Sequence, residues 1–519
     1  MQRKILLKKT VLLGISTLAS RVLGFLRQLL LARFLGVGAI ADAFWAALRL
    51  PNSLYKIFVE GSLGAALIPT AVKLNLEAGP LQVNRVMSLM LLMVQLFFLV
   101  FAFVTTVYAS QIMLFIIPGW SNMPQLVDQA ANFLSIFVFY IFFFSASSFL
   151  AGVLQAQKRF FLASAQPIIF NILLVLELLL CLKYNSSPMV LAWMFVVNSI
   201  FVLGITVWVY SRFASFSFIF DKETWGRLWE LIKRLIPCFI NLGIVEINLF
   251  IGTMFASFLP EGSISLLSYS SSFLRLPLSL FSAAFATVSL PYFTQIGSYA
   301  PRRLGFQLVE SAKLTLFIMA PVALVMAFFS YDIFLTTLVS DRFSYIQAYE
   351  GAQILMAFVP GLFFFSLNRI LLNIYYAQQQ TTLPTFISLL GAICNTSLNL
   401  LLMYWLSTSG IALATSIAAA IQVIVSLWLL HKRLNMPLYV RQFLRFAFQY
   451  MVQLSIFIPI FYCLYRGAIA IIPLITGPFA QFFMVKIGLW LWVGPLCLLL
   501  MACLWLTRKL FGLKCYYLD

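Results

Sequence analysis

Charged residues, histidine and catalytic patterns are scarce in this sequence. Only 9% of its 519 residues are charged and 63% are hydrophobic, too little polar surface for a soluble chain of this length. The single histidine, His431, stands beside Lys432 and Arg433, and no HExxH, GxSxG or P-loop pattern occurs. The seven cysteines lie mostly in apolar stretches without paired spacing, so neither disulfides nor a metal site is predicted. These absences favour a transporter over an enzyme.

The hydrophobic residues gather in stretches of about 20, the length that a helix needs to cross a hydrocarbon core. Unbroken apolar runs such as Met90–Val104 exclude the alternating pattern of a barrel strand. We therefore expect an all-α polytopic membrane protein with about fourteen transmembrane helices. The predicted spans are 10–35, 42–74, 86–108, 131–154, 160–182, 188–210, 235–259, 264–293, 314–330, 352–377, 383–406, 411–430, 446–465 and 482–506.

The distribution of positive charge sets the predicted orientation. With both termini in the cytoplasm, 23 of the 34 lysines and arginines fall in the inside segments. The outside connections hold only Lys183, Arg342 and Arg466. The net charge of +19 is thus mainly a topology signal and a contact for anionic lipids, and it does not indicate nucleic acid.

A polar connection divides the spans into six and eight, which suggests two related halves. Arg49-Leu50-Pro51-Asn52-Ser53-Leu54 in the second span resembles Arg275-Leu276-Pro277-Leu278-Ser279-Leu280 in the eighth. We predict two pseudo-symmetric six-helix lobes at residues 1–211 and 235–432, joined by a cytoplasmic connection at 212–234. Residues 433–519 would add two C-terminal helices and a tail.

Arginines within the first span need an explanation, because one at a helix centre costs roughly 2.5–3.5 kcal/mol. At about 100° per residue, one helical face carries Thr17, Ser20, Arg21, Gly24, Arg27 and Gln28. Arg33 falls on the opposite side, near the outer end, and no function is assigned to it. The face is either a buried polar seam between helices or the wall of a water-filled cavity that receives an anion.

The second span repeats this pattern at spacings of 7, 3, 4 and 4. Its residues are Asp42, Arg49, Asn52, Lys56 and Glu60, and they share one face if the helix continues past Pro51. Asp42 and Glu60 are expected to pair with basic residues. The other half offers Arg275 in the eighth span and Arg369 in the tenth. Because basic residues outnumber acids at these positions, a polyanionic ligand is favoured.

These residues resemble a known family. The run from Ser20 to Arg27, then Asp42-Ala43-Phe44, Leu50-Pro51-Asn52 and Glu60-Gly61, is similar to the opening of the MurJ (MviN) family of the MOP exporter superfamily. That family flips lipid II, the peptidoglycan precursor. Weaker matches follow in order, among them Arg159-Phe160 with Pro167 and Asn171.

The resemblance implies a location in the bacterial cytoplasmic (inner) membrane, a central cationic cavity and alternating access. Arginines of the cavity would grip the diphosphate of the substrate, and the two C-terminal helices within residues 433–519 would form a groove for its polyprenyl chain. The expected substrate-binding residues are Ser20, Arg21, Arg27, Asp42, Arg49, Asn52, Lys56, Arg275 and Arg369. Two family arginines fall at Tyr55 and Ser272 here, and whether Lys56 and Arg275 replace them stays open. No organic cofactor is expected, whereas coupling to a monovalent ion is left undecided.

Three hypotheses follow. The first is a lipid II flippase that restores growth to a bacterium depleted of its own flippase, with lipid II, membrane lipids and cell-wall synthesis enzymes as partners. The second is a flippase for another polyprenyl-linked saccharide of the same superfamily. The third is an envelope scaffold without transport activity, whose arginines are structural.

Overall fold

A computed structural model describes residues 2–60, 68–157, 159–297, 300–378, 380, 382–476 and 488–518. The chain forms two compact units, Met1–Ser265 and Leu266–Asp519, and each is described by itself. The predicted lobe boundaries at 211 and 235 stay a prediction. Helix α8 begins at Lys222, inside the predicted connection, and runs past 235, and it packs against α3 and η1 within the first unit.

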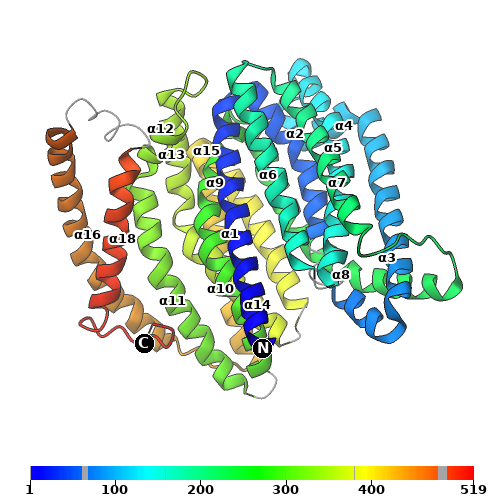
Figure 1. Cartoon of the computed structure of the whole chain (residues 1–519). Coiled ribbons are helices and arrows are strands. Elements are labelled where there is room, and N and C mark those ends of the chain that lie inside the picture. The colour runs from blue at the N-terminus through cyan, green and yellow to red at the C-terminus, as the bar shows by residue number, and fades with distance from the viewer. Residues whose placement is uncertain are drawn as a thin grey trace. The chain divides into compact units, whose positions relative to one another are not determined.

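All the regular secondary structure of the first unit, among the residues that the structure describes, is helical (Figure 1). They are α1 (Gln2–Leu35), α2 (Ala39–Tyr55), the π-helical η1 (Lys56–Glu60), α3 (Ile68–Val107), α4 (Ala109–Ile116), η3 (Pro118–Trp120), α5 (Pro124–Ala156), α6 (Phe160–Lys183), α7 (Pro188–Tyr210) and α8 (Lys222–Ala256).

Local sequence explains where these helices begin. Pro124 and Pro188 stand in the first turn of α5 and α7, where proline loses no hydrogen bond and its fixed φ suits the helix. Asp221 caps α8, because its carboxylate accepts a hydrogen bond of 2.6 Å from the Thr224 amide. Hydrogen bonds from the Thr224 side chain and from its amide, together with the nearby Arg85, lower the pKa of Asp221 below its ordinary value.

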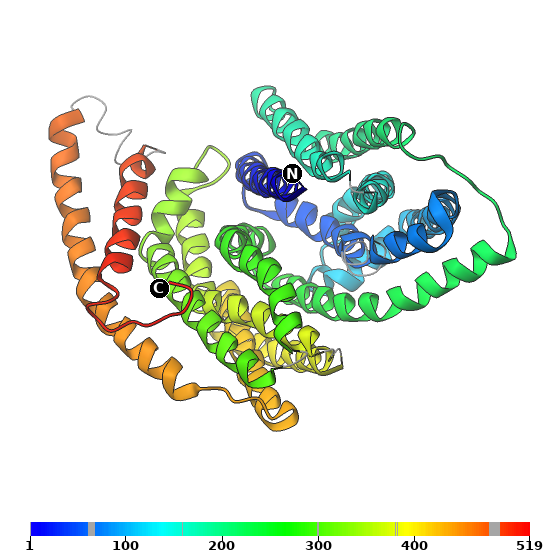
Figure 2. The same cartoon turned by 60° about the horizontal axis from the view of Figure 1, so that its bottom comes forward.

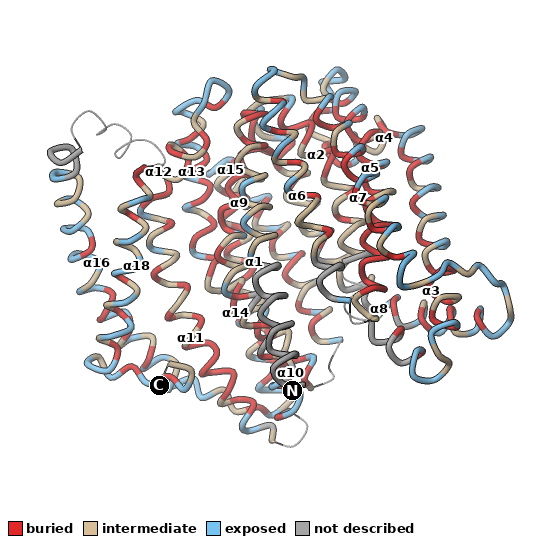
Figure 3. The backbone as a smooth tube through the Cα atoms, in the orientation of Figure 1, coloured by how far each residue is buried: buried red, intermediate tan, exposed pale blue. Residues whose placement is uncertain are grey.

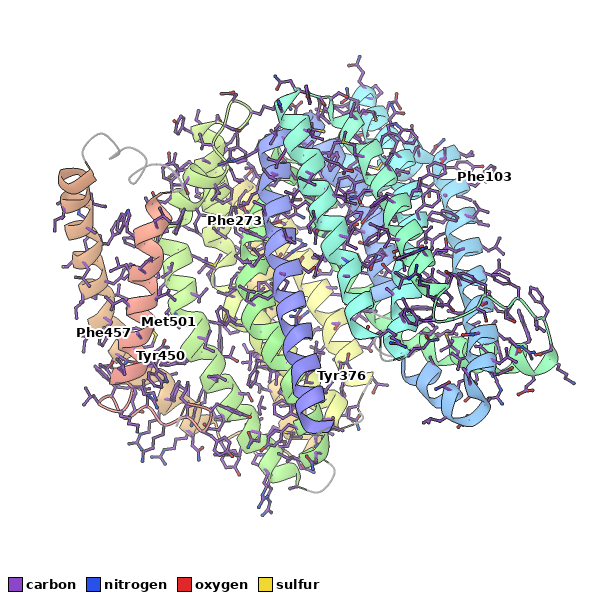
Figure 4. The ribbon with its side chains drawn as sticks, viewed as in Figure 1. Phe103, Phe273, Tyr376, Tyr450, Phe457 and Met501 are labelled. Atoms are coloured by element: carbon purple, nitrogen blue, oxygen red, sulfur yellow. The ribbon has the colours of Figure 1, made fainter. Side chains whose placement is uncertain are left out.

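Helix α5 is the centre of the first unit. It packs against α2, α3, α6 and α7, and 78% of its most apolar stretch is buried. Figure 3 colours the buried residues of the chain red. Phe44 of α2 meets Phe133 and Phe137 of α5 edge to face, at centroid distances of 5.4 and 5.0 Å. By contrast, α3 presents an outer apolar face, where Phe103 is 71% exposed (Figure 4).

The second unit is likewise helical among the residues described, and α9 begins just before it. Its helices are α9 (Ser263–Pro277), the π-helical η4 (Leu278–Ser282), α10 (Ala283–Gly297), α11 (Pro301–Phe328), α12 (Ser330–Thr337), α13 (Tyr345–Phe358), α14 (Gly361–Ala377), α15 (Thr382–Leu434), α16 (Val440–Thr476) and α18 (Leu489–Thr507).

Two hydrophobic clusters hold the second unit together. In one, α14 packs against α10, α11 and α15 through side chains such as Leu371, Ile374 and Tyr375. In the other, α11, α16 and α18 meet around Phe317 and Tyr450, whose hydroxyl donates to the Phe317 carbonyl at 2.8 Å. Only 11% of the most apolar stretch of α16 is buried, so the side chains of this stretch are mostly accessible to membrane lipid.

Helix α15 is two spans joined by a tight turn. Ser407 has φ 51°, outside the helical region, and the chain bends there between the eleventh and twelfth predicted spans. A Cβ at Gly410 would lie 2.2 Å from the Leu402 carbonyl oxygen, so this close approach requires glycine. The predicted break between residues 406 and 411 is thus confirmed.

The all-α polytopic class is confirmed. Among the described residues, eight helices are long and apolar enough to cross a membrane, or nine if the bent pair α13 and α14 forms one span. Every predicted span overlaps a helix, a pair of consecutive helices or one half of α15. Two helices begin well before the predicted spans: α8 begins at Lys222 rather than near Leu235, and α11 begins at Pro301 rather than near Leu314. Lys313 therefore lies inside a helix instead of in the connection before it.

Candidate functional site

The predicted stripe on α1 lies beside α6. Arg27 donates through Nη1 to the Asn171 side-chain oxygen of α6 at 3.0 Å, and the Asn171 amide nitrogen donates to the Ser20 carbonyl at 3.3 Å. Asn171 is 7% exposed, whereas Ser20 and Arg27 are half-buried. A neutral, buried amide therefore orients the Arg27 guanidinium and leaves its positive charge uncompensated.

Arg21 lies on the same helix, six residues before Arg27, and is half-buried. Its side chain forms no hydrogen bond or ion pair with any other residue that the structure describes. A half-buried guanidinium within a predicted membrane span needs a polar partner, and water or an anion can supply one. Together, Arg21 and Arg27 supply two positive charges that no described carboxylate neutralises.

Asp42 has a different environment from the one expected. Its two carboxylate oxygens accept hydrogen bonds of 2.7 Å from the Gly262 and Ser265 amides at the start of α9, and only 2% of the residue is exposed. Asp42 thus caps these backbone groups. The expectation that Asp42 pairs with a basic residue was wrong, because the backbone amides occupy both of its oxygens.

Glycine is required at position 262 for this contact. Gly262 has φ +94°, and a Cβ there would lie 2.5 Å from a methyl carbon of Val37. The bend brings the Gly262 amide within reach of Asp42.

The stripe on α2 is a seam with α8. Arg49 donates to the Leu249 carbonyl at 2.8 Å, and Lys56 forms an ion pair of 3.1 Å with Glu246. Ser53 donates to the other oxygen of Glu246 at 2.7 Å, and Glu246 is 6% exposed. The buried carboxylate therefore has a partner on each oxygen, and the charge of Lys56 is neutralised.

Other predicted residues near this seam are placed as follows. Asn52 is half-buried, one turn after the Arg49 position, and Tyr55 shares a hydrogen bond of 3.0 Å with Ser148 of α5. The Glu60 and Thr17 side chains lie outside the described residues. Tyr55 is therefore held against α5, and the lysine beside it is held against α8.

The Arg-Leu-Pro match between the halves has a structural counterpart. Pro51 lies inside α2, which continues into the π-helical η1, and Pro277 ends α9, which continues into the π-helical η4. Proline has no N–H and displaces the carbonyl four residues earlier, so it loosens the helical ladder in both places. Such π-helical turns are rare and occur frequently at functional sites.

The second unit contributes two exposed arginines, Arg275 on α9 and Arg369 on α14. The Ser272 hydroxyl donates to the Ser268 carbonyl of its own helix at 2.8 Å, so it adds no charge in place of the family arginine. Asn368, next to Arg369, donates to the Gln422 side-chain oxygen at 2.6 Å. This amide pair fixes α14 to α15 beside the arginine.

Two partners were not foreseen from the sequence. Asn171 was noticed only as part of a family resemblance, and Glu246 only as one acid among several within the spans. The available signal was a polar residue in an otherwise apolar helix, which usually faces the protein interior. The sequence does not show which basic residue each of them contacts, because Asn171 lies 144 residues from Arg27 and Glu246 lies 190 residues from Lys56.

Known proteins resemble this chain over most of its length. A family model described as "Lipid II flippase MurJ" matches residues 31–489. A protein of Rhizobium meliloti described as "Probable lipid II flippase MurJ" is 30% identical over 463 residues, covering 84% of this chain and 83% of that protein. The chain belongs to the MurJ family. It is therefore a membrane transporter rather than an enzyme.

Other relatives agree with this assignment. A protein of Rhizobium tropici with the same description is 29% identical over 440 residues, covering 82% of this chain and 81% of its own. A solved structure of "Lipid II flippase MurJ, inward closed conformation" superposes with a TM-score of 0.77 at 23% identity, covering 96% of this chain and 99% of its own. An inward-facing MATE transporter of the MOP superfamily reaches 0.66 at 12% identity, with coverages of 79% and 93%. These two structures share the fold.

Proposed function

We propose that this protein is a flippase that moves lipid II from the cytoplasmic to the outer leaflet of the bacterial inner membrane. The names of its curated relatives support this cargo. The observation that carries the proposal is the pair of uncompensated arginines, Arg21 and Arg27, on α1. The diphosphate that links the headgroup of lipid II to its polyprenyl chain is an anion of matching charge.

The chemistry of α1 suits a diphosphate. A guanidinium offers a planar fork of donors that binds two phosphate oxygens at once, and hydration competes with it less than with an ammonium. Asn171 orients Arg27 before the ligand arrives, so less side-chain freedom is lost on binding. Arg21 would take the second phosphate, with Ser20 beside it on the same face.

The remaining predicted residues have other tasks in this proposal. Arg49 and Lys56 hold α2 against α8, and Asp42 fixes the turn before α9. Asn52 would line the substrate path beside that seam. Arg275 and Arg369, both exposed, would meet the substrate from the second unit.

Alternating access would move the bound diphosphate across the membrane, with the two compact units as the moving bodies. The distribution of basic residues supports cytoplasmic termini. Cell-wall synthesis enzymes that supply or consume lipid II are the expected partners. No cofactor is required by this scheme, and coupling to a monovalent ion would add a driving force without changing the anion site.

The test is translocation of fluorescent lipid II by the purified protein in reconstituted vesicles. We expect lipid II to become accessible on the opposite leaflet, and expression of the chain to restore growth to a bacterium depleted of its own flippase. Translocation of a different polyprenyl-linked saccharide in preference to lipid II would contradict the cargo. No translocation of either, with the protein folded, would favour the scaffold hypothesis.

A further inference from the structure

The tail that follows α18 forms part of a pocket in the second unit, away from the arginines of α1 in the sequence. After Thr507 the chain turns back toward α11, as the red segment in Figure 2 shows. The Tyr516 amide donates to Glu310 of α11 at 2.6 Å, and the Tyr517 hydroxyl donates to Gln307 at 2.6 Å. Two successive tail residues are therefore attached to one face of α11.

A buried ion pair anchors this attachment. Lys313 and Glu310 are 2.6 Å apart, and their side chains are only 8% and 3% exposed. Glu310 uses its other oxygen for the Tyr516 amide, and Lys313 also donates to the Lys514 carbonyl at 3.3 Å. The two charges cancel each other, so the pair fixes the tail without adding net charge to its surroundings.

The pocket lies between this tail, the start of α11 and the start of α16. Its volume is about 450 Å³, within the range of roughly 300–1,000 Å³ that small-ligand pockets span. The lining residues are Phe306, Glu310, Lys313, Gln442, Arg445, Phe446, Gln449, Gly512, Lys514, Cys515 and Tyr516.

Arg445 and Lys514 make the pocket cationic. Both are exposed, and neither side chain forms an ion pair or hydrogen bond with another described residue. Since Glu310 and Lys313 cancel, the lining carries a net charge of two positive units. Gln442 and Gln449 add neutral hydrogen-bond donors. Two free cations with amide donors beside them form a site for a phosphate group.

The neighbouring face of α16 is suited to acyl chains. Leu444, Phe448 and Met451 recur at helical spacing and are 59%, 72% and 61% exposed. Arg445 follows Leu444 directly, so the cationic pocket begins where this apolar strip begins. A phosphate carried by a lipid could therefore place its charge in the pocket and its chains along α16, which a free phosphate could not do.

We propose that this pocket binds the phosphate of an anionic lipid headgroup, with Arg445 and Lys514 as its charged contacts and the C-terminal tail as one wall. The site goes beyond the proposed transport function, since it uses none of the polar and charged side chains assigned to lipid II. All three segments that form it lie at ends that the positive-inside prediction assigns to the cytoplasm, where the membrane surface carries anionic lipids.

Lipid titration of the intact protein tests this site. Native mass spectrometry with phosphatidylglycerol, and with phosphatidylcholine for comparison, measures the affinity of the wild type and of the double variant Arg445→Gln/Lys514→Gln. Each surface cation contributes about fivefold to binding of an anionic lipid, so we expect about a thirtyfold loss of phosphatidylglycerol affinity in the double variant. Phosphatidylcholine should bind more weakly and respond little.

A matched control is available on the same elements. Arg441 on α16 and Lys509 in the tail are exposed but do not line the pocket, so Arg441→Gln/Lys509→Gln removes the same charge. We expect this control to retain most of the affinity and both double variants to keep the thermal midpoint of the wild type. Equal losses in the two double variants, or none in either, would overturn the site.

An arm with inorganic phosphate separates the two sources of the anion. Excess inorganic phosphate should displace phosphatidylglycerol only weakly, because it gains nothing from the apolar strip on α16. Saturable binding of inorganic phosphate without a preference for phosphatidylglycerol over phosphatidylcholine would overturn the lipid assignment. Because no arm measures transport, failure here is distinguishable from failure of the flippase proposal.

Discussion

The basic stripes of α1 and α2 look alike in the sequence but have different surroundings in the structure. On α2, Lys56 is neutralised by Glu246, and Arg49 donates a hydrogen bond to a backbone carbonyl of α8. On α1, Arg27 meets only a neutral amide, and Arg21 has no partner among the described residues. Protein groups thus stabilise the positive charges on α2, whereas on α1 water or a ligand must stabilise them. The difference separates structural cations from candidate binding cations.

The largest expected effect comes from removing a cation of α1. Arg27→Ala and Arg21→Ala should each lower lipid II translocation about a hundredfold, because loss of a charged partner of a phosphate costs several kcal/mol. Initial rates in reconstituted vesicles measure this. The thermal midpoint of Arg21→Ala should stay near that of the wild type, since the Arg21 side chain forms no hydrogen bond or ion pair with another described residue.

Arg27→Lys is the matched variant for that prediction. It keeps the charge but loses the fork of donors, so we expect an intermediate rate. If the two alanine variants translocated lipid II at the wild-type rate, the assignment of α1 would be wrong.

The next effect separates α2 from α1 by its readout. Glu246→Gln leaves Lys56 without its carboxylate, and we expect a loss of about 1–2 kcal/mol of stability, moderated because the Lys56 side chain is 36% exposed. Thermal unfolding in detergent, followed by tryptophan fluorescence, checks this. Translocation per folded molecule should change little.

The double variant Lys56→Met/Glu246→Met supplies the control for that seam. An apolar pair of similar volume can replace a buried ion pair at little cost, so stability should return toward the wild type. A double variant that is as stable as the wild type but transports no lipid II would instead place Lys56 in the binding site.

A smaller effect is expected for the residue that orients Arg27. Asn171→Ala removes the hydrogen bonds to Arg27 and to the Ser20 carbonyl. Because Arg27 is partly exposed, water replaces part of the loss, and we expect about a fivefold lower translocation rate at low lipid II concentration. At saturating lipid II the rate should recover, unless Asn171 only supports the packing of α1 on α6.

The smallest effect is predicted for Arg33, the arginine of α1 that lies off the polar face. Arg33→Gln should change translocation by less than about twofold, because its side chain can reach the membrane surface. The same vesicle assay measures it. A loss as large as that of Arg27→Ala would show that position on the helical face does not decide the role of an α1 arginine.

The helices and the polar faces could be predicted from the sequence, because apolar length and the 100° rotation per residue are local properties. The turn at Ser407 was predicted from the polar residues around it. The partners could not be predicted: Glu246 lies 190 residues from Lys56, and a helical wheel does not show which element a face meets. The π-helical η1 also changes the rotation per residue after Tyr55, so a helical wheel drawn for an ideal α-helix does not apply there. Lys313 was misassigned because a buried ion pair one turn apart looks like a polar loop in a hydropathy profile.

Equilibrium binding of lipid II to the purified wild type and to three variants tests the central claim most directly. The variants are Arg21→Gln, Arg27→Gln and Lys56→Gln, and each removes one positive charge. The account predicts that the two α1 variants lose at least about tenfold in affinity, whereas Lys56→Gln binds like the wild type and loses only stability. Equal losses in all three variants, or a loss confined to Lys56→Gln, would contradict it.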